Sequence, residues 1–161
     1  MTEKKYFQDY MPGNVCFGCG KEHPEGLQIK SYWDGSAAIC HWQPEEKYRG
    51  WPKLLNGGII ATIIDCHCMG TAMAYAYQQE DRDIDSTPFY RYATSGLKIK
   101  YLKPTSTKDL ITLSAQIIEH NQRKITMTCS LKSRDIITAQ AEVIAIKVYD
   151  SSTNNETNQF E

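Results

Sequence analysis

A continuous apolar stretch over residues 56–79 constrains the fold of this chain more than any other feature. It opens with Gly57 and Gly58, and its only acidic or basic side chain, apart from His67, is Asp65. Apolar residues recur at helical spacing on every side, which predicts one long helix buried nearly all round. Because a lone carboxylate is costly to bury unless it is paired or hydrogen-bonded, we expect Asp65 to serve chemistry rather than packing.

Charge and composition restrict the class of protein. The chain has 161 residues with 41% hydrophobic and 11% aromatic side chains, which suits a single globular domain with a core of its own. A net charge of −1, from 18 basic and 19 acidic residues, gives no electrostatic reason to expect nucleic acid or an anionic membrane as a partner.

Six cysteines occur, and no apolar segment of the signal-peptide type follows Met1. Free thiols in a reducing cytoplasm are therefore the expectation. The apolar stretch is long enough to cross a membrane, but Asp65 and His67 within it make insertion costly. The sequence predicts a soluble, cytoplasmic protein.

The remaining segments divide the chain into an arm, a domain and a tail. Residues 1–26 are rich in turn formers and predict an ordered arm, residues 27–149 form the domain, and the polar residues 150–161 predict a disordered tail. Strands are expected at 27–33, 38–42, 97–102, 111–117, 125–132 and 136–149, with Asp34-Gly35 as a hairpin turn and 78–95 as a loop.

Two strands, one long helix and an antiparallel meander predict an α+β fold in which one sheet buries one helix. The helix is too apolar to leave its far side in water. A second copy of the chain is the simplest cover for that side.

Five short motifs occur in order between about residues 14 and 148: Cys16-Phe17-Gly18-Cys19-Gly20, Pro24-Glu25-Gly26-Leu27, Tyr48-Arg49-Gly50-Trp51-Pro52, Gly57-Gly58 with Asp65, and Ile99-Lys100-Tyr101-Leu102-Lys103-Pro104. In this order they resemble the hotdog-fold acyl-CoA thioesterases of the phenylacetic-acid-degradation and 4-hydroxybenzoyl-CoA thioesterase type. The resemblance implies an antiparallel sheet wrapped around one central helix. It also implies metal-independent hydrolysis of an acyl-CoA thioester to free acid and coenzyme A, without a cofactor.

The family's helix opens with His-Gly-Gly, and a carboxylate lies nine positions after the histidine. Here Asp65 lies nine positions after Asn56, so the carboxylate matches and the histidine is replaced. An amide can donate a hydrogen bond but cannot carry a proton near neutral pH. Asn56 either orients the substrate carbonyl or simply caps the helix, a role for which Asn is favoured.

The helix start suits a thioester carbonyl. Its N–H groups are unpaired and carry partial positive charge, and glycines at 57 and 58 allow close approach. Gly57 N–H is the candidate oxyanion donor, and Asp65 the general base or nucleophile. The alternatives are that the glycines only make a tight turn and that Asp65 is a hydrogen-bonded structural carboxylate.

Helix geometry separates the two catalytic candidates. Asp65 is eight residues beyond Gly57, hence about 12 Å along the helix axis. A reacting carbonyl needs both groups within about 3 Å. The active site should therefore lie between two subunits, in a homodimer or a homotetramer built as a dimer of dimers. His67, about 200° round the helix from Asp65, is expected to be a core histidine.

Other residues allow further predictions. Tyr48 and Trp51 either wall the acyl pocket or belong to the core, and Lys100 is a candidate for binding coenzyme A. Cys16-x-x-Cys19 resembles half of a zinc site but lacks a second half in the sequence, so no metal is expected.

Two further functions compete with hydrolysis. A non-catalytic hotdog protein that binds an acyl-CoA or another apolar ligand is kept open by the missing histidine. A dehydratase or hydratase ranks last, because those enzymes pair a histidine with a carboxylate and no histidine directly precedes Gly57.

Overall fold

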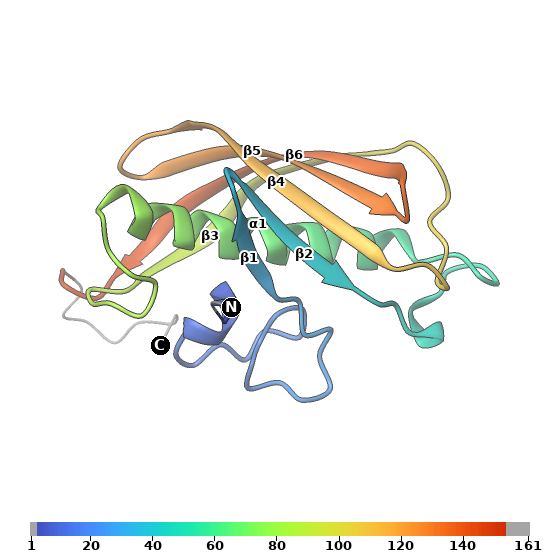
Figure 1. The fold of residues 1–161 in the computed structure, drawn as a ribbon, viewed down its shortest axis with the longest axis horizontal. Helices are drawn as coiled ribbons and strands as arrows, with labels where there is room; N and C mark the ends of the chain where they lie inside the picture. Colours follow the sequence, from blue (N-terminus) through green and yellow to red (C-terminus); the bar gives the residue numbers. More distant parts are fainter. Residues whose placement is uncertain (1–2, 154–161) are drawn as a thin grey trace.

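The computed structural model describes residues 3–153, and in them one long helix lies against one curved sheet of six strands (Figure 1). The elements, in chain order, are η1 (Phe7–Tyr10), β1 (Ser31–Asp34), β2 (Ala37–Trp42), η2 (Glu46–Tyr48), α1 (Gly57–Gln79), β3 (Tyr90–Tyr101), β4 (Ile111–His120), β5 (Lys124–Ser133) and β6 (Ile136–Asp150). All neighbouring strands are antiparallel, in the order β1-β2-β4-β5-β6-β3. The predicted α+β architecture, a hotdog-like sheet wrapped around one helix, is confirmed.

The hairpin predicted at Asp34-Gly35 joins β1 to β2, and Gly35 adopts the positive φ of 60° that the turn requires. The strand predicted at 27–33 begins only at Ser31. The preceding residues bond to the arm instead: Leu27 N–H donates to Phe17 O, and Ile29 N–H donates to Gly18 O.

The loop predicted over residues 78–95 is too long. Strand β3 begins at Tyr90 and pairs with β6 along its whole length. Bulges between Arg91 and Tyr92 and between Thr94 and Gly96 interrupt the two-residue alternation, so the pattern that predicts a strand is absent from its first half. β3 is an edge strand of the sheet.

Helix α1 is covered on one side by the sheet and on another by the arm of residues 3–26. Gln8 of η1 packs so closely on Gly70 that a Cβ added there would lie 2.5 Å from Gln8 Nε2. The arm thus provides part of the cover that the sequence analysis expected from a second copy. A half-exposed stripe remains on the helix, consisting of Ala61, Thr62, Asp65 and Met69.

Among the described residues, α1 is the one helix whose length and apolar composition would allow it to cross a membrane. Of its most apolar 18-residue window, 67% is buried inside the fold. Burial in the core therefore accounts for this composition, and the feature is weak evidence for a membrane span.

His67 is a fully buried core residue, as predicted. Its Nε2 donates to Ala38 O at 3.1 Å, which leaves Nδ1 to accept from the Ser31 hydroxyl at 2.8 Å. Gln8 bonds both Oγ and N–H of Ser31. Burial lowers the pKa of His67 to about 4, so the imidazole is neutral at physiological pH.

A disordered tail was predicted for residues 150–161. From residue 154 onward this segment lies outside the described residues.

Candidate active site

Asn56 caps helix α1. Its backbone is extended, with φ −63° and ψ 134°, and its Oδ1 accepts from Gly58 N–H at 2.7 Å and from Ile59 N–H at 3.2 Å. These contacts satisfy two of the unpaired donors of the helix start. Of the two roles that the sequence left open, the structure shows the cap.

Replacing Asn56 with Ala is expected to lower the free energy of unfolding by about 1 kcal/mol and to leave turnover nearly unchanged, because only the cap is lost. Asn56→Asp, which keeps an acceptor in the same place, is the control and should retain the stability. Chemical unfolding and steady-state kinetics on both variants check this. A turnover loss of about 10²-fold in Asn56→Ala would instead give the amide the role of an oxyanion-type donor.

Gly57 is exposed at the first turn of α1. Its carbonyl accepts a hydrogen bond from Tyr101 Oη at 2.8 Å, whereas within residues 3–153 no group accepts its N–H. A free N–H at the positive end of a helix is a suitable donor to a developing oxyanion. Gly58, by contrast, already gives its N–H to the cap.

Asp65 is half-buried on α1 and accepts a hydrogen bond on Oδ1 from the hydroxyl of Thr94 in β3. Burial raises the pKa of this carboxyl, the Thr94 hydrogen bond partly opposes that rise, and electrostatic repulsion from Cys16 adds to it. In the described part of the chain no side chain bonds Oδ2. Asp65 thus has one positioned oxygen and one that can take a proton or attack a carbonyl.

One chain does not bring Gly57 and Asp65 together, since about 12 Å of helix separates them. Both lie along β3, however, where Tyr101 contacts the first and Thr94 the second. The bulge after Thr94 places both β3 side chains on the face that looks toward α1. Thr94 and Tyr101 were not among the predicted site residues, because only the packing of β3 on α1 reveals their roles.

The loop before α1 carries two predicted pocket residues. Tyr48 is half-buried, lies 6.0 Å from Trp42 between ring centroids, and accepts Asn56 N–H on its carbonyl at 3.0 Å. Trp51 is 77% exposed, so it is not a core residue. Both residues belong to the segment that leads into α1, and Tyr48 bonds to Asn56, the residue before Gly57.

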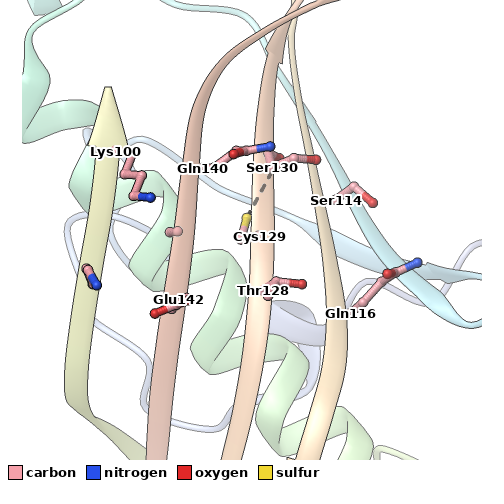
Figure 2. Close-up of a pocket in the computed structure, with 10 residues that line it drawn as sticks. Lys100, Ser114, Gln116, Thr128, Cys129, Ser130, Gln140 and Glu142 are labelled. Carbon is pink, nitrogen blue, oxygen red and sulfur yellow. Dashed lines mark hydrogen bonds between the residues drawn. The ribbon is translucent and has the colours of Figure 1, made fainter. Parts of the chain in front are cut away.

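Lys100 lies elsewhere. Figure 2 shows it on the outer face of the sheet, beside a cavity of about 480 Å³ lined by polar side chains of β3, β4, β5 and β6. Its ladder partner Gln140 points to the same outer face, whereas the neighbouring Ala139 and Ala141 are buried. The sheet separates Lys100 from Gly57 and Asp65 of the same chain.

Three cysteines from two segments of the chain lie close together, which their spacing in the sequence does not show. The thiols of Cys16 and Cys19 in the arm and of Cys66 on α1 lie within 4.8 Å of one another. His67 and Cys68, which follow Cys66, turn away into the core. Only the docking of the arm on α1 reveals this cluster.

Comparison with known proteins agrees with this architecture. No protein-family model matches the chain. The curated acyl-coenzyme A thioesterase THEM4 of Rattus norvegicus is 27% identical over 108 residues, which are 67% of this chain and 41% of the relative. The chain thus spans about two fifths of that relative's length.

Solved structures extend the comparison. A Streptococcus mutans protein whose structure holds acetyl-CoA has a TM-score of 0.60 at 12% identity, over 76% of this chain and 90% of that chain, and shares the fold. A thioesterase superfamily protein from Shewanella loihica has a TM-score of 0.63 at 30% identity, over 80% of this chain and 96% of that chain. Because that identity extends over nearly the whole of the Shewanella protein and the same helix-in-sheet fold, the chain belongs to the thioesterase superfamily.

Proposed function

We propose that the protein hydrolyses an acyl-CoA thioester to a free acid and coenzyme A at a site shared between two copies of the chain. The proposal rests on the environment of Asp65. This carboxylate is half-buried, accepts a hydrogen bond from Thr94 through one oxygen, and has a pKa that burial raises. The name of the rat relative supports acyl-CoA as the substrate class. All six cysteines are free, which supports a reducing, cytoplasmic location.

In the proposed reaction the thioester carbonyl oxygen accepts the N–H of Gly57, and the dipole of α1 stabilises the charge that develops there. Asp65 of the other copy takes a proton from water while the water oxygen attacks the carbonyl carbon. When the tetrahedral intermediate collapses, the carbon–sulfur bond breaks and the coenzyme A thiolate leaves and is protonated. Alternatively, Asp65 attacks the carbonyl itself and water then hydrolyses the resulting anhydride. Neither route uses a metal.

The edge of β3 supports the proposed dimer. Its twelve residues expose a row of backbone groups, and Leu97 and Tyr101 on it are 38% and 54% exposed. Antiparallel pairing of two β3 edges about an axis near Lys98 would carry Thr94 of one copy toward Tyr101 of the other. That arrangement sets Asp65 against Gly57 of the second copy and covers the half-exposed stripe on α1.

A binding protein without catalysis is the second candidate. The side chain of Asn56 favours this candidate. Its oxygen accepts the hydrogen bonds of the cap, and its amide has no group that could carry a proton. Such a protein would use the same dimer interface and bind an acyl-CoA unchanged.

Release of free thiol from a panel of acyl-CoA thioesters, followed with a thiol reagent, tests the proposal. We expect at least one acyl chain to give steady turnover, and sedimentation to show a dimer or a dimer of dimers at micromolar protein. Tight acyl-CoA binding without thiol release would favour the binding protein. A monomer with full activity would contradict the shared site.

A further inference from the structure

Two segments far apart in the sequence bring three thiols together. Cys16 and Cys19 belong to the arm, and Cys66 lies in the middle of α1. Their sulfur atoms all lie within 4.8 Å of one another, and Cys16 Sγ and Cys66 Sγ are 3.8 Å apart. The other three cysteines, Cys40, Cys68 and Cys129, are buried and do not join this cluster.

The arm is folded to hold its two sulfurs in this place. Gly20 N–H closes a tight turn on Cys16 O at 2.7 Å, and Gly18 N–H donates to Cys16 Sγ at 3.3 Å. The amide of Asn14 donates to Cys19 Sγ at 3.5 Å. Donors aimed at sulfur stabilise the thiolate, which is the form that binds a metal.

Gly18 makes the close approach to α1 possible. A Cβ at this position would lie 2.3 Å from Cys66 Sγ, so any other residue would push the arm away from the helix.

Zinc is bound tetrahedrally by thiolates at about 2.3 Å, which sets neighbouring sulfurs about 3.8 Å apart. The Cys16–Cys66 separation of 3.8 Å has this value. We propose that Cys16, Cys19 and Cys66 bind one Zn²⁺, which fixes the arm to α1. Binding is not a redox step: each cysteine binds as a thiolate, the thiol protons go to solvent, and three zinc–sulfur bonds form. Water or another small ligand takes the fourth position.

The proposed site does not take part in the hydrolysis mechanism, although Cys66 is the neighbour of Asp65 in the chain. Its role is structural, since it ties residues of the arm to the helix that carries the carboxylate. No metal was expected from the sequence, because Cys16-x-x-Cys19 has no second half there. In the structure Cys66 supplies the third ligand, from another element.

Metal titration of the full chain, freed of metal with a chelator and kept under reducing conditions, tests the proposal. We expect Co²⁺ to bind with a stoichiometry of about one per chain and to give thiolate-to-metal charge-transfer absorption together with the visible bands of a tetrahedral site. Zn²⁺ should displace it, remove the colour and raise the melting temperature. Absence of a thiolate-bound Co²⁺ spectrum would overturn the proposal.

Single replacements identify the ligands. Cys16 and Cys19 lie in a half-buried loop, so the variants Cys16→Ser and Cys19→Ser should fold. Each should weaken Zn²⁺ binding by at least about 10²-fold, because loss of even an outer-shell partner of a metal typically costs 10–100-fold in affinity. Cys129→Ala, outside the cluster, is the control and should bind like the wild type. Equal Zn²⁺ affinity in Cys16→Ser and the wild type would contradict the site, as would a cluster that oxidises to a Cys16–Cys66 disulfide and binds no metal when reduced.

Discussion

Replacing Asp65 with Asn is expected to lower turnover of the best acyl-CoA substrate by at least about 10²-fold, as loss of a general base typically does. The amide keeps the volume of the side chain but can neither accept a proton from water nor attack as a carboxylate. The substrate's KM should change much less than kcat, because binding is not the function removed. Steady-state thiol release on wild type and variant measures both constants.

The fold should survive this change, since a neutral amide is cheaper to bury than a carboxylate. A thermal melt at or above that of the wild type is the control for folding. In the wild type, rate should fall with acid as Asp65 is protonated, and this fall should occur above the ordinary pKa of 3.8 because burial raises it. A folded Asp65→Asn protein with unchanged hydrolysis would place the catalytic group elsewhere.

Local patterns predicted most of the fold. Apolar residues at every helical position predicted the helix, and Asp34-Gly35 predicted the hairpin. Both predictions were possible because each signal lies within one short segment. The first half of β3 was missed because its two bulges break the alternation on which strand prediction depends. The cover supplied by the arm was missed because turn-rich segments carry no periodic pattern at all.

The candidate site divides in the same way. Gly57 and Asp65 could be selected from the sequence, since a helix start and a lone carboxylate in an apolar helix can both be recognised within one element. Thr94 and Tyr101 could not, because their contacts with α1 depend on how β3 packs. Cys66 is a third case: its partners lie about fifty residues earlier, in the arm. Tertiary contacts of this kind produce no characteristic residue spacing from which they could be predicted.

Replacing Gly57 with Pro should lower turnover by about 10²- to 10³-fold, the range seen when one oxyanion donor is removed. Proline removes the free N–H and yet is favoured at the first position of a helix. The preceding Asn56 is already extended, with ψ 134°, as a residue before proline must be. The helix and its cap should therefore be retained, which circular dichroism and a thermal melt would verify.

Gly57→Ala is the matched control, because it keeps the N–H and adds only a methyl group. Its Cβ would lie 3.6 Å from the Tyr101 ring, an ordinary contact. Turnover close to that of the wild type in Gly57→Ala, beside a large loss in Gly57→Pro, would assign the effect to the N–H. Equal losses in both would show that the position is limited by space and that the oxyanion is held by another group.

The two inactive variants together test whether the site is shared. If Gly57 of one copy works with Asp65 of the other, a dimer of one Gly57→Pro chain and one Asp65→Asn chain has one complete site and one doubly defective site. Random pairing of equal amounts, by co-expression or subunit exchange, should then restore about a quarter of wild-type activity, since half of the two-fold dimers are mixed. If each chain forms its site alone, the mixture can show no more than the average of the two variants. Recovery above that average therefore requires that substrate is held by one subunit and attacked from the other.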